Sequence, residues 1–101
     1  MKQSFNIYYG TIGKKLGVKY RITKNFWQNQ DAIDFAKKSA ESFYYKNEGK
    51  YGIPTFNQIL KESELTGLDV EFLYQDHIND MTRYYAIPTE LDSIPYDKLQ
   101  W

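Results

Sequence analysis

His77, the only histidine of the chain, is the residue whose type would most readily support catalysis. Asp76 precedes it and Asp80 follows about one helical turn later, so a carboxylate is available to orient its imidazole ring. The sequence positions no serine or cysteine beside it as a nucleophile, and one histidine with carboxylates makes a poor metal site within a single chain. We therefore expect His77 at a helix surface or terminus, with neither a catalytic nor a metal-binding role.

Other catalytic signatures are also missing from the sequence. The chain has no cysteine, so it has neither a thiolate nucleophile nor a disulfide. Its carboxylates form no recognisable glycosidase or nuclease pair, and its glycines form neither a Walker loop nor a dinucleotide-binding fingerprint. The sequence therefore predicts a protein without enzymatic activity that uses no cofactor.

The two charge signs are separated along the chain, although the formal net charge is zero. Residues 1–30 carry six lysines and arginines and no acid, whereas residues 55–80 carry one lysine and six acids, a net charge of −5. Such a dipole favours a partner of opposite charge or head-to-tail self-association. We therefore look for function on surfaces.

The acidic half carries the leading hypothesis. Two successive helices are expected there, and Ser63, Gly67 and Leu73 fit the spacing of a helix-turn-helix. The second of these helices has no lysine or arginine, so DNA phosphates would repel it. We predict instead a protein-binding surface, which engages a host or phage protein; its expected residues are Glu71, Tyr74, Gln75 and Asp76, with Tyr44 or Tyr45 and Trp101 as hydrophobic anchors.

The basic half supports an alternative. A sheet surface with cations and an exposed ring can bind an anion or single-stranded nucleic acid, and the expected residues are Tyr8, Lys14, Lys15, Lys19, Arg21 and Lys24. Lysines on outward strand positions also serve simply to keep a sheet soluble. A third hypothesis is that a small nucleotide is held in a pocket shared between subunits of a homo-oligomer.

These surfaces must be positioned by a small set of elements, of which the helix Asn29 to Glu48 is the clearest. Apolar residues recur on one side of it, at Ala32, Ile33, Ala36, Ala40, Phe43 and Tyr44. Asn29 is the expected N-cap, and Gly49 is expected to end the helix in a left-handed conformation. The small alanines suit a helix that lies across a sheet.

The sheet begins with a hairpin, because residues 5–9 and 18–22 alternate between apolar and polar. We expect the face that receives the helix to carry Phe5, Ile7, Tyr9, Val18, Tyr20 and Ile22, and the outward face to carry Tyr8, Lys19, Arg21 and Thr23. Residues 81–87 alternate in the same way and predict a third strand, which ends at Pro88.

Between the helix and the third strand, the sequence predicts a short helical pair. Thr55 and Gln58 fit a capping box that opens the first of them, with Phe56, Ile59 and Leu60 turned inward. The second is expected to bury Leu68, Phe72, Leu73 and Ile78. Residues 1–101 thus predict one α+β domain in the order ββαααβ: a three-stranded antiparallel sheet, one long helix on it and a short helical pair.

The remaining segment, residues 89–101, keeps several apolar side chains, and we expect it to pack back on the domain or to dock on a partner. No stretch approaches the ~20 apolar residues of a membrane span. Together with the lack of cysteine, this predicts a cytoplasmic protein that does not interact with membranes.

The stretches NIYYGTIGKKLGVKY, EGKYGIP and MTRYYAIPTELDSI carry a resemblance that covers most of the chain. In them the sequence is similar to small proteins of unknown function that phages and prophages of Gram-positive bacteria encode. The resemblance implies no activity for any residue. It implies a setting, because compact phage proteins of this kind often bind and inhibit a host factor, including defence proteins; the cytoplasm would then be that of the host.

Overall fold

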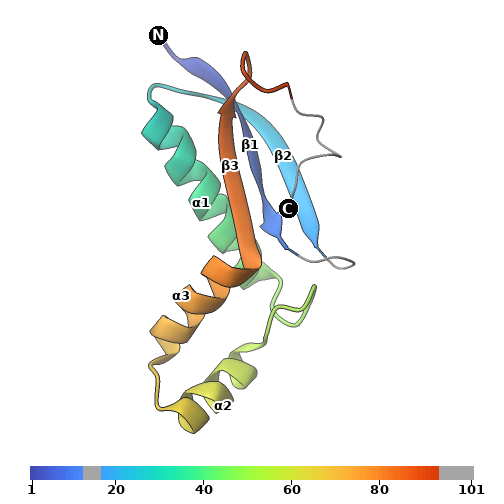
Figure 1. Cartoon of the computed structure of the whole chain (residues 1–101), viewed down its shortest axis with the longest axis vertical. Coiled ribbons are helices and arrows are strands. Elements are labelled where there is room, and N and C mark those ends of the chain that lie inside the picture. The colour runs from blue at the N-terminus through green and yellow to red at the C-terminus, as the bar shows by residue number, and fades with distance from the viewer. Residues whose placement is uncertain (13–16, 94–101) are drawn as a thin grey trace.

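The computed structural model describes residues 1–12 and 17–93 (Figure 1). Its elements follow the chain as β1 (Gln3–Thr11), β2 (Val18–Phe26), α1 (Asn29–Lys46), α2 (Phe56–Thr66), α3 (Val70–Met81) and β3 (Thr82–Pro88). The three strands form one antiparallel sheet in the order β2-β1-β3. The predicted α+β class and the order ββαααβ are therefore confirmed.

Helix α1 covers one face of the sheet, where it lies over β1 and β3 (Figure 1). The fully buried Ala32 and Ala36 let the helix approach Phe5 and Ile7 of β1 closely, because a methyl side chain adds little thickness between the layers. The predicted N-cap is wrong by one residue: Gln28 occupies the cap position without a side-chain hydrogen bond, and Asn29 is the first residue of the helix.

In β1, the side chains expected to face the helix do so. In β2, the corresponding side chains are not buried as expected. Phe5 and Ile7 are buried, whereas Tyr20 and Ile22 of β2 are 42% and 39% exposed. The physical reason is the lateral position of α1, which leaves the inner face of β2 only partly covered.

The expectation that Tyr8 points outward into solvent is wrong, because its side chain is only 1% exposed. The segment that follows β3 turns back over the outer face of the sheet. The amide of Thr89 donates to the carbonyl of Ser4 at 3.1 Å, and Asp92 accepts hydrogen bonds from the Tyr8 hydroxyl and, at 2.8 Å, from Asn6 Nδ2. Residues 94–101 of this predicted docking segment lie outside the described residues.

Helices α2 and α3 form an arm that projects beyond the end of the sheet (Figure 1). The predicted capping box at its start is confirmed: Thr55 Oγ1 accepts from the Gln58 amide, and Gln58 Oε1 accepts from the Thr55 amide. Gly67 links the two helices at φ +74°, a left-handed conformation that glycine adopts without strain. The Cα radius of gyration is 15.4 Å, above the ~13 Å typical of a compact chain of this length.

The arm is anchored to the end of α1 by a second core cluster of Tyr44, Ile53 and Ile78. Ile59 of α2 and both Leu73 and Ile78 of α3 are buried as expected. The other predicted inward side chains of the arm are largely exposed, at 47% for Phe56, 36% for Leu60, 44% for Leu68 and 57% for Phe72. Helices α2 and α3 pack on each other and on the end of α1, and the surface that they share is too small to cover these side chains.

In the part of the chain that the structure describes, no helix combines the length and the apolar character needed to cross a membrane.

A candidate protein-binding surface of aromatic rings and carboxylates

Three aromatic rings meet on the surface where the arm joins α1. The ring centroids of Tyr45 of α1 and Tyr74 of α3 lie 5.4 Å apart, and Phe56 of α2 stacks on Tyr74 at 6.4 Å and 12°. Tyr45 and Phe56 are each 47% exposed. Three separate helices thus contribute to one continuous aromatic surface.

Carboxylates lie near two of these rings, Tyr45 and Tyr74. The Tyr74 hydroxyl donates a hydrogen bond of 3.1 Å to Glu48 Oε1. Burial and this bond to Glu48 raise the pKa of Tyr74 to about 12. Burial also raises the pKa of Tyr45, with the negative charges of Glu41, Glu71 and Glu48 adding to the effect. We call Tyr45, Phe56 and Tyr74, together with Glu41, Glu48 and Glu71, the acidic aromatic patch.

The local structure explains why these side chains converge. Consecutive helical residues point about 100° apart, so Tyr44 enters the core while Tyr45 stays on the surface beside it. Their rings remain in contact edge to face at 5.7 Å. Phe56 is the first residue of α2 and is fixed there by the capping box of Thr55, which sets the direction in which the helix leaves the loop.

The patch continues into one further exposed apolar side chain of the arm. Leu60 lies one turn after Phe56 on the same side of α2, and it is 36% exposed. Leu65, near the tip of the arm, is 86% exposed but lies about 180° around α2 from Phe56, outside the patch. Aromatic rings edged with carboxylates attract cationic side chains, through cation–π contacts and charge-assisted hydrogen bonds. The arrangement is therefore chemically suited to a basic, partly apolar protein segment.

The structure brings together only part of the predicted protein-binding set. Tyr45, Glu71 and Tyr74 share the patch, whereas Asp76 lies about 200° around α3 from Tyr74 and Gln75 about 100°. Tyr44 is wrong as a surface anchor because its side chain is completely buried. Trp101 lies outside the described residues.

The predicted anion-binding set is divided between the two faces of the sheet. Tyr8 is wrong as an exposed stacking ring, because it is buried under Asp92. Arg21 pairs with Tyr8 in the β1–β2 register and lowers the pKa of its hydroxyl, whereas burial and Asp92 raise it to a larger extent.

The lysines of this predicted set are likewise separated. Lys19 shares the outer face of the sheet with Arg21, two residues further along β2. Lys24 lies on the other face, with its Nζ 4.5 Å from the ring centre of Phe35. Lys14 and Lys15 are outside the described residues.

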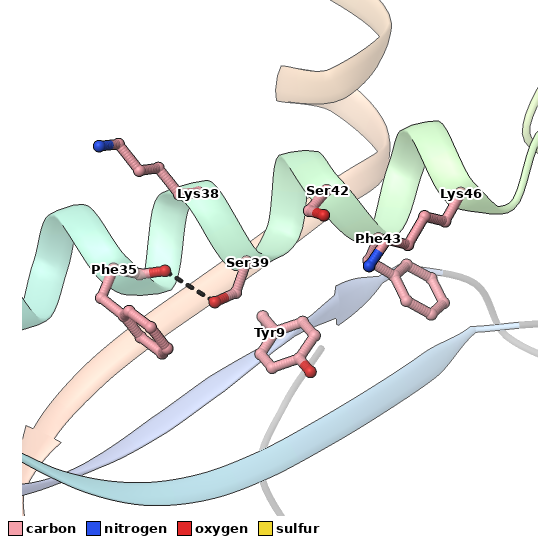
Figure 2. A pocket seen from close by; sticks show the side chains of 7 residues that line it. All are labelled: Tyr9, Phe35, Lys38, Ser39, Ser42, Phe43 and Lys46. Carbon is pink, nitrogen blue, oxygen red and sulfur yellow. Dashed lines mark hydrogen bonds between the residues drawn. The ribbon is translucent and has the colours of Figure 1, made fainter.

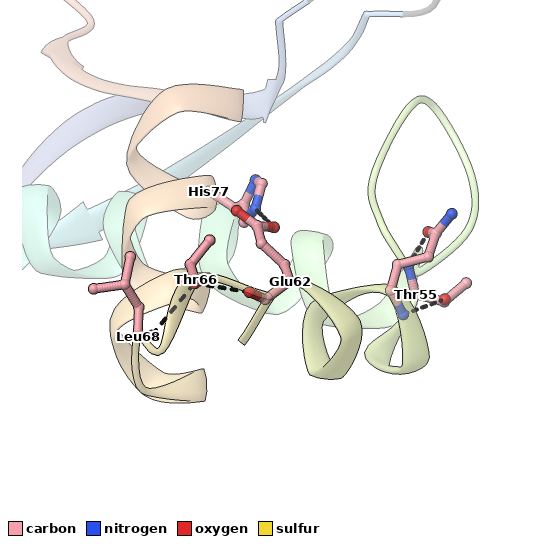
Figure 3. A network of polar contacts seen from close by, with 6 residues as sticks. Thr55, Glu62, Thr66, Leu68 and His77 are labelled. Atoms are coloured by element: carbon pink, nitrogen blue, oxygen red, sulfur yellow. Dashed lines mark hydrogen bonds and ion pairs between the residues drawn. The ribbon is translucent and has the colours of Figure 1, made fainter. Parts of the chain in front are cut away.

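His77 contacts α2 rather than the carboxylate of Asp80. Its Nε2 lies 3.0 Å from Glu62 Oε2, and this contact joins the two helices of the arm (Figure 3). In α2, Thr66 Oγ1 donates to the Glu62 carbonyl and accepts from the Leu68 amide. These two hydrogen bonds close the turn at the tip of the arm. Within residues 1–12 and 17–93, no group of three or more metal-ligating side chains could hold a metal ion.

Sequence reasoning missed Glu41, Glu48 and Phe56 as parts of this site. Glu41 lies one turn before Tyr45, a spacing that places both on the same side of a helix and that would have been a usable signal. Phe56 and Glu48 carried no such signal, because their approach to Tyr74 depends on how the arm folds back on α1.

No protein-family model matches the chain, and comparisons with curated proteins and with solved structures found no similar protein.

Proposed function

We propose that the protein is a non-enzymatic interaction module that binds a basic segment of another protein through the acidic aromatic patch. The observation that carries the proposal is the contact of Tyr45, Tyr74 and Phe56 across three helices, in which Tyr45 and Phe56 are half-exposed and carboxylates lie near the two tyrosines. Rings fixed by one another lose little side-chain entropy on binding, and tyrosine is enriched among residues that dominate interface energies.

The arm itself supports this proposal. Helix α2 packs mainly against α3, and both carry large apolar side chains that nothing else in the described chain covers. Exposed apolar surface edged with charge is typical of protein-binding sites. A partner that covers Phe56, Leu60 and the patch would bury these side chains at little conformational cost.

In the setting that the resemblance to phage proteins implies, the partner is a host protein in the cytoplasm and the module is its inhibitor or modulator. A basic partner follows from the three carboxylates of the patch. Self-association through the basic hairpin is the competing arrangement, and it predicts an increase in mass with concentration.

The proposal is tested by titrating the protein with a fluorescent ten-residue peptide that contains five arginines. We expect saturable, salt-sensitive binding that weakens about tenfold in Glu71→Lys and in Tyr45→Ala, because each removes a contact worth about 1–2 kcal/mol. Asp76→Lys is the matched control, since it makes the same charge change on the same helix outside the patch. Equal weakening by Asp76→Lys and Glu71→Lys would mean that only net charge matters, and it would refute the proposed surface.

A further inference from the structure

A second surface lies on the opposite flank of α1, where the helix and the inner face of the hairpin leave a groove of about 420 Å³ (Figure 2). It exists because α1 lies over β1 and β3 and leaves β2 partly uncovered. Its apolar lining consists of Tyr9, Phe35 and Phe43. The volume falls within the roughly 300–1,000 Å³ of pockets that bind small organic ligands.

The rings of the groove are held in place from outside it. Tyr20 of β2 stacks on Tyr9 with centroids 5.6 Å apart and also contacts Phe43 at 5.4 Å. Phe43 in turn stacks with Tyr51 at 6.0 Å. At the other end, Phe26 supports Phe35 at 5.4 Å. A planar ligand ring would therefore enter a preformed aromatic site and would not have to order it.

The polar side chains of the groove are cationic or hydroxylic. Lys38, Ser39, Ser42 and Lys46 line it from α1, and none of its lining residues, as far as the chain is described, is acidic. Figure 2 shows Lys46 extending towards Phe43, whereas Lys38 points away from the strands at the rim. Lys24 adds a third cation at the Phe35 end. The groove thus has the opposite charge to the acidic aromatic patch on the other flank of the same helix.

The hydroxyl groups add donors and acceptors at defined positions. Ser39 Oγ donates to the Phe35 carbonyl at 2.8 Å, so its hydrogen is used and its lone pairs remain as acceptors (Figure 2). Ser42 lies in the next turn of the helix, on the same wall as Lys46. An acceptor, a hydroxyl and an ammonium group therefore follow one another along α1, the helix that also carries Phe35 and Phe43, and Tyr9 faces them from β1.

We propose that this groove binds a ligand in which a planar heteroaromatic ring is joined to a phosphate, as in a nucleotide. The ring lies among Tyr9, Phe35 and Phe43, and the phosphate contacts Lys46 and the Ser42 hydroxyl. A second copy that presents the same groove is a poorer occupant, because the lysines at the rim would face one another across the interface. The site lies within one subunit and on the helix-facing side of the hairpin, unlike the anion and nucleotide sites expected from the sequence.

The test is calorimetric titration of the full chain with AMP, with adenosine and with inorganic phosphate. We expect AMP to bind at least about tenfold more tightly than adenosine or phosphate alone, because only AMP satisfies both the rings and the cation. Binding of AMP should weaken about tenfold in Lys46→Glu. It should change less than about twofold in Lys37→Glu, a matched charge reversal on the same helix that does not line the groove.

A ten-nucleotide oligothymidine tests whether the groove binds a free nucleotide or a nucleotide within single-stranded nucleic acid. Binding of the oligonucleotide more than about tenfold tighter than TMP indicates single-stranded nucleic acid, and equal affinity indicates a free nucleotide. The absence of heat with every nucleotide probe would overturn the proposal. Equal weakening by Lys37→Glu and Lys46→Glu would overturn it as well. The arginine-peptide titration is independent of these results, because its residues lie on the other flank of α1.

Discussion

The hydroxyl of Tyr74 in α3 donates a hydrogen bond of 3.1 Å to Glu48, which lies just beyond the end of α1. This bond ties the projecting arm to the helix that carries the sheet, and it lies within the acidic aromatic patch. Together with the core cluster of Tyr44, Ile53 and Ile78, this contact between residues far apart in the sequence helps to set the orientation of the arm and the geometry of the proposed binding surface.

Replacing Tyr74 with phenylalanine should test this tie while keeping the ring. We expect Tyr74→Phe to lower the free energy of unfolding by about 0.5–1 kcal/mol, because the bond is at the surface and water can replace it in part. Urea denaturation followed by circular dichroism measures the change. Tyr45→Phe is the control, since none of the described residues is seen to bond its hydroxyl; identical midpoints for the two variants would contradict the predicted role of the bond.

The hydroxyl of Tyr44, unlike that of Tyr74, is buried and has no hydrogen-bond partner among the described residues. Burying such a group costs about 1–3 kcal/mol. We expect Tyr44→Phe to keep the packing of the ring against Ile53 and Ile78 and to raise the stability by about 1 kcal/mol. Thermal unfolding at pH 7 provides the measurement. A clear decrease in the melting temperature would show that the hydroxyl is satisfied in solution.

The two raised tyrosine pKa values predict a loss of stability at alkaline pH. Burial raises the pKa of Tyr44 to about 12, and burial together with Glu48 does the same for Tyr74, from an ordinary value of 10.0. Between pH 10 and pH 12, the two tyrosine hydroxyls lose their protons more readily in the unfolded chain than in the folded protein. The folded state therefore holds more protons, and it loses stability as the pH rises. Unfolding free energies measured from pH 9 to pH 12 should fall less steeply in Tyr44→Phe than in the wild type. A parallel decline in both proteins would contradict the assignment to Tyr44.

Asp92 accepts hydrogen bonds from Tyr8 and Asn6 and holds the segment after β3 against the sheet. We expect Asp92→Ala to destabilise the protein by about 1–3 kcal/mol, because the buried Tyr8 hydroxyl loses an acceptor. Hydrogen exchange should also become faster at Thr89, whose amide donates to the Ser4 carbonyl. Glu90→Ala removes an exposed carboxylate from the same segment and should have an effect within about 0.5 kcal/mol. Equal effects of the two substitutions would refute the role of Asp92.

Local patterns predicted the elements well because each has a local physical cause. The alternation around Ile7 and Ile22 specifies a hairpin, and Thr55 with Gln58 satisfies the first amides of α2. The helical period also placed Tyr44 on the apolar side of α1. The prediction that Tyr44 is also a surface anchor conflicted with this helical period. In the structure Tyr44 is buried, as the period predicts.

Local sequence patterns could not predict how elements far apart in the chain pack on one another. The lateral position of α1 decides that Tyr20 and Ile22 are exposed, and no local pattern contains that position. The burial of Tyr8 depends on Asp92, which lies 84 residues away. The acidic aromatic patch likewise depends on the angle at which the arm leaves α1, so Phe56 appeared to be a core residue in the sequence.

The location of the binding surface is tested most directly by recording amide NMR spectra of the protein during addition of the arginine-containing peptide. We expect the largest shifts in residues 41–48, 56–60 and 71–74, and we expect saturation to need about tenfold more peptide in Glu71→Lys but the same amount in Asp76→Lys. Shifts concentrated on β2 and the outer face of the sheet, or spread evenly over all acidic residues, would contradict the proposed surface.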